Sequence, residues 1–209
     1  MIEIASLAEC NAYLKDIELV VLDMDDTLYS EKEYVYSGYG AVARLLPHID
    51  NAQEELWSAF LNGEPAFDSV LRKKGVWSEE LMQACLHAYR FHTPDIHLYP
   101  DAQELLCTLA KQGYKLGLIT DGRPEGQRAK IAALGLERWM QYMIVTDELG
   151  GVQFRKPNPT AFCMMQERFG IPFSRMCYIG DNPQKDFIAP QQLGMRSIYF
   201  RNADGLYYR

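Results

Sequence analysis

The chain has 209 residues, of which 48% are hydrophobic and 23% charged, values that suit one globular domain or one domain with an inserted lobe. Its formal net charge of −7 argues against nucleic acid as a partner, because binding to a phosphate backbone needs a basic face. No apolar stretch approaches the roughly 20 residues that cross a membrane, and the N-terminus has neither the basic nor the long apolar segment of a secretory signal.

The five cysteines are scattered along the chain, odd in number, and contain no Cys-x-x-Cys pair. Free thiols in a reducing compartment are therefore expected, and we predict a cytoplasmic protein. Cys163 and Cys177 have apolar neighbours in the sequence, where a cysteine usually acts as a small hydrophobic residue.

The first predicted elements lead to a group of acidic residues. A capping-box pattern near the N-terminus predicts a short helix over residues 7–15. Residues 19–22 are all apolar, which favours a strand buried on both faces. This run ends at Asp23, and Asp25 and Asp26 follow. Because ligands bind beyond the carboxyl ends of parallel strands, we expect these acids at the mouth of a site, with Asp23 and Asp25 pointing the same way. The alternative is an acidic turn.

A long segment without strand signals follows, over residues 29–99. Connections between neighbouring strands usually have about 4–6 residues, so this segment must be a structured insertion. Its apolar residues fall at helical spacing, and Ser78 is a candidate helix N-cap. We predict a small all-helical lobe with helices over residues 34–46, 52–61, 66–74 and 79–90. Its tyrosines either line a substrate pocket or form a packing surface, and they include Tyr29, Tyr34, Tyr36 and Tyr39.

The rest of the chain alternates strands and helices. Strands are predicted over residues 114–120, 143–146, 176–179 and 197–200. Helices are predicted over residues 101–112, 124–134 and 183–193, and another starts at Asn158 or Thr160 and runs to about Phe169. Asp101 is the expected N-cap of the first of these helices. Such alternation is typical of βαβ units. The predicted fold class is therefore α/β: a Rossmann-like parallel sheet with helices on both faces, plus the small all-helical lobe.

Three of the predicted strands end in loops that carry aspartate or threonine. The four motifs, in chain order, are Asp23-Met24-Asp25-Asp26-Thr27, Thr120, Lys156 before Pro-Asn-Pro, and Gly180-Asp181 with Asp186. With these motifs the chain resembles the haloacid dehalogenase (HAD) superfamily of phosphohydrolases, over about residues 18–200. The resemblance implies a catalytic core over residues 1–28 and 100–209. It also implies that residues 29–99 form a helical cap of the C1 type that closes over the site.

The resemblance also implies roles for the motif residues. Asp23 would be the nucleophile that forms an aspartyl-phosphate, and Asp25 would protonate the leaving oxygen and later activate water. For the first task the pKa of Asp25 would have to be higher than that of a free aspartate, and neighbouring acids could raise it.

Positive charge and hydrogen-bond donors would hold the phosphoryl group. Thr120 and the backbone N–H groups of Asp121 and Gly122 would bind its oxygens, and Lys156 would neutralise the nucleophile and the phosphate together. Alternatively, Lys156 is a solvated lysine in a loop. Arg123 and Arg155 would either bind an anionic substrate group or be exposed loop residues.

The charges of the motif residues predict a metal ion. Four carboxylates, from Asp23, Asp25, Asp181 and Asp186, would meet one lysine and an anionic substrate. A hard divalent cation with oxygen ligands resolves this imbalance, and Mg²⁺ suits a phosphoryl substrate. The resemblance implies as ligands carboxylate oxygens of Asp23 and Asp181 and the backbone carbonyl of Asp25. Asp186 is expected to act from farther away, through water.

These observations predict a Mg²⁺-dependent phosphatase that acts on a small phosphorylated metabolite, of the sugar or nucleotide phosphate class. One alternative is a phosphotransferase or phosphomutase that uses the same aspartyl-phosphate. Another is a metabolite-binding module without activity, although a module that only binds needs no acid–base carboxylate such as Asp25. A dehalogenase is disfavoured, because that branch of the superfamily lacks the second acid. The expected oligomeric state is a monomer or a homodimer.

Overall fold

The computed structural model of this protein describes residues 1–206. Six strands within these residues form one sheet in the order β1-β6-β5-β2-β3-β4, and all neighbouring strands are parallel. Their bounds are β1 (Ile2–Ile4), β2 (Leu19–Leu22), β3 (Lys115–Thr120), β4 (Tyr142–Val145), β5 (Met176–Gly180) and β6 (Arg196–Phe200). The predicted α/β fold class with a parallel sheet is confirmed.

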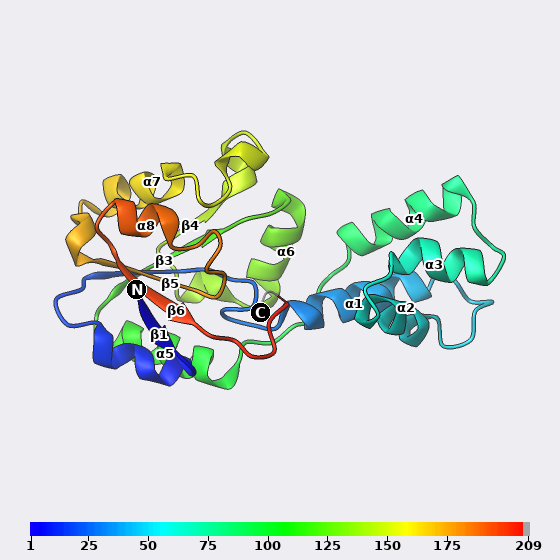
Figure 1. Ribbon diagram of the computed structural model, residues 1–209, viewed down its shortest axis with the longest axis horizontal. Coiled ribbons are helices and arrows are strands. Elements are labelled where there is room, and N and C mark those ends of the chain that lie inside the picture. Colours follow the sequence, from blue (N-terminus) through cyan, green and yellow to red (C-terminus); the bar gives the residue numbers. More distant parts are fainter. Residues whose placement is uncertain (207–209) are drawn as a thin grey trace. The chain divides into compact units, whose positions relative to one another are not determined.

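Helices cover both faces of this sheet (Figure 1). The 3₁₀ helix η1 (Leu7–Tyr13) and helix α5 (Pro100–Lys111) pack on one face, and α7 (Thr160–Phe169) and α8 (Ile188–Gln192) lie on the other. Helix α6 (Pro124–Ala133) packs against β4. Short 3₁₀ turns complete the connections: η2 (Leu136–Arg138), η3 (Thr146–Leu149), η4 (Val152–Phe154) and η5 (Phe173–Arg175).

Strand β2 lies between β3 and β5, and all four of its residues are fully buried. A strand with helices on both of its faces needs apolar side chains on both, which explains why its sequence does not alternate. The backbone N–H of Asp23 still bonds to the carbonyl of Ile179 at 2.9 Å, so the first acidic residue continues the ladder between β2 and β5. The sheet therefore places Asp23 at the centre of its carboxyl edge.

The chain divides into two compact units, one formed by Met1–Glu31 with His97–Arg209 and the other by Lys32–Ile96. The second unit is all-helical, with α2 (Ala52–Leu61), α3 (Ala66–Lys73), α4 (Glu79–Arg90) and all but the first residue of α1 (Glu31–Ala43). Its core includes Tyr39, whose ring packs edge-on against Phe60 and Phe67. Tyr34 is buried as well, so packing accounts for both of these tyrosines.

Several element ends differ from the predictions. Ser78 caps α4 as expected, since its hydroxyl accepts from the N–H of Leu81. Asp101, in contrast, does not cap α5: it lies in the first turn of the helix, and its carboxylate accepts from the hydroxyl of Ser6. The helix expected over residues 183–193 is reduced to α8, and strand β1 was not predicted, because three residues are too few for a pattern. Within residues 1–206, none of the helices could span a membrane.

Candidate functional site

The carboxyl ends of β2, β3 and β5 open into one cavity of about 340 Å³. The loops after these strands, the loop around Lys156 and the buried face of α6 line it. All of the lining residues belong to the unit that contains the sheet. They are Asp23, Asp25, Glu31, Asp121, Gly122, Gln127, Lys130, Arg155, Lys156, Asp181, Asn182 and Lys185.

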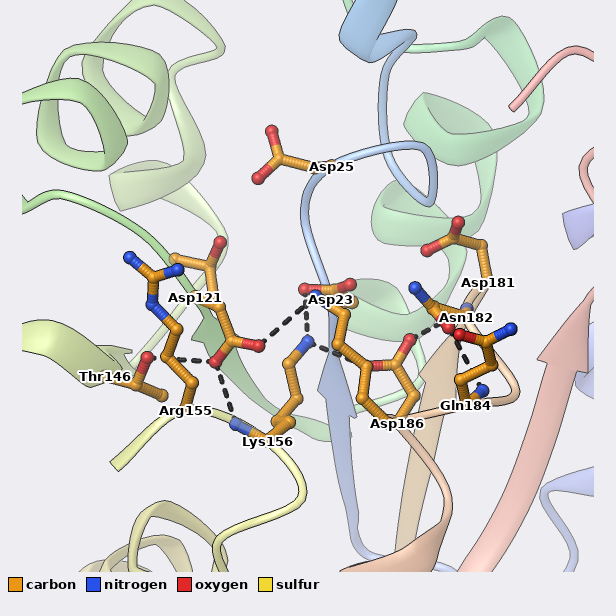
Figure 2. A network of polar contacts seen from close by, with 12 residues as sticks. Asp23, Asp25, Asp121, Thr146, Arg155, Lys156, Asp181, Asn182, Gln184 and Asp186 are labelled. Carbon is orange, nitrogen blue, oxygen red and sulfur yellow. Dashed lines mark hydrogen bonds and ion pairs between the residues drawn. The ribbon is translucent and has the colours of Figure 1, made fainter. Parts of the chain in front are cut away.

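A buried lysine joins two of the predicted acidic residues (Figure 2). The Nζ of Lys156 lies 2.7 Å from Oδ1 of Asp23 and 2.8 Å from Oδ1 of Asp186, and it bonds to the hydroxyl of Tyr178 at 2.9 Å. The Lys156 side chain is fully buried. Burial lowers the pKa of Lys156, but the carboxylates of Asp186 and Asp23 outweigh this and hold it well above its ordinary value. Lys156 is thus a permanent cation in the site, and the alternative of a solvated loop lysine is wrong.

Carboxylates outnumber cations at this point. Carboxylate oxygens of Asp23, Asp181 and Asp186 lie within 4.8 Å of one another, and all three residues are buried. No lysine or arginine within residues 1–206 forms an ion pair with Asp181. Burial raises the pKa of Asp23 to about 7, and burial together with the carboxylates of Asp23 and Asp186 raises the pKa of Asp181 to about 9. Three buried acids share one buried ammonium group.

This donor set fits a divalent cation. Mg²⁺ prefers hard oxygen ligands, and this group of carboxylates lacks positive charge. A cation here would counter the repulsion between the carboxylates that helps to raise the pKa of Asp181. The group of close carboxylates contains Asp23, Asp181 and Asp186 but not Asp25. The Asp25 carboxylate is therefore not expected to bind the metal, and its backbone carbonyl remains the expected ligand. Asp186 also accepts from the backbone N–H of Asn182 at 2.9 Å, in addition to its contact with Lys156.

Asp25 lines the same cavity as Asp23 but has different partners. Its Oδ1 lies 2.7 Å from Nζ of Lys130 and accepts from the hydroxyl of Tyr29 at 2.5 Å, and its Oδ2 accepts from Nε2 of Gln127 at 2.8 Å. Figure 2 shows its carboxylate turned away from the network around Lys156. Burial raises the pKa of Asp25, but the Lys130 ammonium and the hydrogen bonds lower it more. The prediction of a raised pKa for Asp25 is therefore wrong: its pKa is lowered. The sequence does not show that the Lys130 ammonium lies beside this carboxylate.

Of the two roles considered for Tyr29, packing fits the structure and lining the cavity does not. Its side chain is fully buried and is not among the residues that line the cavity. Its hydroxyl also donates to Oδ1 of Asp25 and so helps to fix that carboxylate.

The loop after β3 is held from the side of α6. Thr120 is fully buried, and Nε2 of Gln127 donates to its hydroxyl at 2.5 Å. Gly122 has φ of 141°, a conformation that favours glycine, and a Cβ there would lie 3.1 Å from the Gln127 side chain. A glycine at this position lets the backbone pass close to Gln127, and Gly122 is one of the residues that line the cavity.

Asp121 connects three loops of the site through its carboxylate, a role that the sequence analysis did not assign to it. Its Oδ1 accepts from the Thr146 hydroxyl at 2.9 Å and from the backbone N–H of Lys156 at 3.1 Å, and its Oδ2 lies 3.2 Å from Nζ of Lys185 (Figure 2). Burial raises the pKa of Asp121, but Lys156 and Lys185 lower it more. The Asp121 carboxylate is thus the anionic link that holds Lys156 in place.

Arg155 lines the cavity and is also engaged by a neighbour. Its guanidinium forms a two-point contact with Asp147, with both N···O distances at 2.7 Å. Arg155 is thus a partly exposed arginine of the cavity lining whose charge is already paired with Asp147.

The C-terminal segment supports the acidic loop after β2. Asp26 has a left-handed backbone, with φ of 53°, and its carboxylate accepts from the N–H groups of Glu31 and Leu206 at 2.9 and 2.7 Å. Asn202 donates to the carbonyl of Asp26 at 2.7 Å and to the hydroxyl of Tyr99 at 3.0 Å. The third acid of the motif is therefore structural: it starts α1 and anchors residues far away in the sequence.

The structure brings together the residues that the sequence analysis proposed for the site. Asp23, Asp25, Asp121, Gly122, Lys156 and Asp181 line the cavity, and Thr120 and Asp186 lie fully buried beside them. Sequence reasoning missed Gln127, Lys130 and Lys185. A usable signal for the first two was their spacing of three on a predicted helix, which places both on one face.

Comparisons with known proteins agree with this geometry. Residues 17–194 match the family model of the haloacid dehalogenase-like hydrolases. The chain is 26% identical over 198 residues to a glyceraldehyde 3-phosphate phosphatase of Pyrococcus abyssi, covering 88% of this chain and 82% of that protein. It is 28% identical to a phosphoglycolate phosphatase of Vibrio parahaemolyticus, with coverages of 88% and 83%. A haloacid dehalogenase-like hydrolase of Xanthomonas campestris has the same fold, with a TM-score of 0.59, 20% identity and coverages of 93% and 85%.

Proposed function

Because this chain belongs to the haloacid dehalogenase-like hydrolases, we propose that it is a Mg²⁺-dependent phosphatase that hydrolyses a small phosphorylated metabolite through an aspartyl-phosphate on Asp23. The observation that carries the proposal is the pair of carboxyl groups in one cavity, each with its own buried lysine: Asp23 with Lys156, and Asp25 with Lys130. Relatives named as phosphatases support the same reaction class.

In the first step, a carboxylate oxygen of Asp23 attacks phosphorus, and the bond between phosphorus and the leaving oxygen breaks. Asp25 donates its proton to that oxygen, so the product leaves as a neutral alcohol. Lys156 neutralises the charge on the attacking carboxylate and on the phosphoryl oxygens. Thr120 and the backbone N–H groups of Asp121 and Gly122 hold the remaining phosphoryl oxygens.

In the second step, Asp25 takes a proton from a water molecule, whose oxygen attacks the aspartyl-phosphate. The bond between phosphorus and Asp23 breaks, and inorganic phosphate leaves. The ionised form of Asp25, which Lys130 favours, is the form that this step needs. The first step needs the protonated form, and the negative charge of a bound phosphate raises the pKa of a nearby carboxyl group.

We propose that Asp23, Asp181 and the backbone carbonyl of Asp25 hold Mg²⁺, with Asp186 acting through Lys156 and water. When bound, the ion supplies positive charge to the phosphoryl oxygens as a Lewis acid. The residues proposed as a cap are 29–99, and we place the choice of substrate there. A small phosphorylated metabolite is the proposed substrate class, which the phosphatase relatives support.

The proposed function is tested by hydrolysis of 4-nitrophenyl phosphate, with Mg²⁺ and with EDTA. We expect turnover with Mg²⁺, loss of turnover in EDTA, and recovery when Mg²⁺ is returned in excess, because three buried carboxylates share one buried ammonium group. Turnover that survives EDTA and dialysis unchanged would contradict the metal dependence. Phosphate that appears on an added sugar instead of in water would indicate a phosphotransferase.

Mg²⁺ is also expected to change how stability depends on pH. The pKa values of Asp23 and Asp181 are about 7 and about 9 in the folded protein, above their ordinary value of 3.8. At pH values between the ordinary pKa of 3.8 and these raised values, the folded state therefore binds more protons than the unfolded state. The free energy of unfolding of the metal-free protein thus falls as the pH rises through this range. Because Mg²⁺ binds the ionised carboxylates, it should raise the melting temperature more at pH 8 than at pH 6. Equal shifts at both pH values would argue against this cluster as the binding site.

A further inference from the structure

Helix α6 presents two buried polar side chains to the cavity. Gln127 and Lys130 are each only 4% exposed, although neither residue type is usually buried in this way. A spacing of three places them on the same face of the helix, next to each other. Arg128, between them in the sequence, points elsewhere and pairs with Glu148. One face of α6 is therefore built from groups that need a polar partner.

The partner of both side chains is Asp25. Lys130 contacts Oδ1 at 2.7 Å, and Gln127 donates to Oδ2 at 2.8 Å. Because a different group holds each carboxylate oxygen, the plane of the carboxylate cannot rotate without breaking one of the contacts. The Tyr29 hydroxyl adds a third bond, to Oδ1. Asp25 is thus fixed in one orientation before substrate binds.

The same amide also connects Asp25 to the phosphate-binding loop. Nε2 of Gln127 donates to the Thr120 hydroxyl at 2.5 Å as well as to Asp25. Thr120 ends β3, and Asp25 follows β2, so one side chain from α6 sets the distance between loops of two neighbouring strands.

Stability alone does not explain a buried ion pair at this place. Burying a lysine and a carboxylate costs desolvation energy that their attraction only partly returns, and an apolar pair of the same volume is often at least as stable. Both residues line the cavity, where the orientation of Asp25 has a chemical consequence.

We propose that Gln127 and Lys130 are positioning residues of the reaction, which hold the Asp25 carboxyl group in line with the leaving oxygen and at a fixed distance from Thr120. This inference rests on the proposed phosphatase function. It assigns to α6 the orientation of the Asp25 carboxyl group, which the residues of the four motifs do not provide.

The inference predicts a dependence on the leaving group. A phenol with an ordinary pKa of about 10 needs a proton from Asp25 as it leaves, whereas the much more acidic 4-nitrophenol leaves readily without one. In Lys130→Met and Gln127→Leu, kcat/KM for phenyl phosphate should therefore fall at least about 10-fold more than kcat/KM for 4-nitrophenyl phosphate. The ratio kcat/KM reports the step in which the phenol leaves, so a slow second step does not obscure the effect.

Two reference variants complete the experiment. Asp25→Asn removes the proton donor itself and should show the same preference for 4-nitrophenyl phosphate, to a larger extent. Arg128→Met changes a cation on the same helix that lies outside the cavity, and both kcat/KM values should stay at the wild-type level. Circular dichroism and thermal melting of each variant establish that it is folded, and Gln127→Leu introduces no charge change.

The outcomes separate the inference from the function on which it rests. A selective loss on phenyl phosphate in Lys130→Met and Gln127→Leu supports positioning. An equal loss on both substrates, or no loss, while Asp25→Asn is selective, overturns it and leaves a structural role. Wild-type protein that hydrolyses neither substrate with Mg²⁺ overturns the proposed function itself.

Discussion

Replacing Asp23 with asparagine is expected to lower turnover at least about 10³-fold while the protein stays folded. The amide has no negative charge and cannot form the aspartyl-phosphate. The fold should tolerate the change, because an ionised carboxylate at this buried position is already unfavourable, as the pKa of about 7 for Asp23 indicates. Asparagine keeps the size of the side chain and an oxygen toward Lys156. Release of inorganic phosphate and a thermal melt measure the two effects.

A matched control is Asp68→Asn, the same change at a partly exposed residue that pairs with Arg72 on α3. Its turnover should equal that of the wild type. The Asp23→Asn protein should be checked by mass spectrometry, since deamidation would restore the aspartate. Full activity in protein that is verified as asparagine would exclude Asp23 as the nucleophile.

Replacing Lys156 with methionine is expected to remove activity and to destabilise the metal-free protein by about 3–5 kcal/mol, the usual cost of breaking a buried ion pair. The lysine is fully buried and lies between Asp23 and Asp186, so its loss leaves two buried carboxylates without their cation. Mg²⁺ should return part of the lost stability, because it supplies positive charge to the same group of carboxylates. Chemical denaturation with and without Mg²⁺ measures both quantities.

Lys185→Met is the matched control for stability. Lys185 lines the same cavity and lies 3.2 Å from Asp121, but its side chain is 32% exposed. Its loss should cost about 1 kcal/mol or less, as for partly exposed ion pairs. If both variants lost the same stability, burial would not be the source of the effect at Lys156.

The sequence alone determined the fold class and the position of the acids. Runs such as Leu19–Leu22 are apolar without alternation because helices cover both faces of the sheet, and this pattern is visible in the order of the residues itself. Since every such strand ends at the same edge of a parallel sheet, Asp23 and Asp181 were expected to meet there, and they do. Local chemistry predicted the cap of α4 at Ser78, because that cap is made within the helix itself. At Asp101 the carboxylate bonds to Ser6 and Leu7 instead, a contact across almost a hundred residues.

The tertiary structure decided what surrounds each acid. Lys130 and Gln127 look in the sequence like ordinary polar residues of an amphipathic helix, and only the packing of α6 turns them toward Asp25. Hydrogen bonds and charges from other segments decide the pKa of a buried carboxyl group, so a motif cannot reveal its direction. The pKa of Asp25 is lowered for this reason, although its acidic neighbours in the sequence suggested the opposite. Residue types and the strand pattern thus fixed where the carboxyl groups gather, whereas contacts between distant segments set their charge and orientation, because electrostatic interactions depend on distance in space.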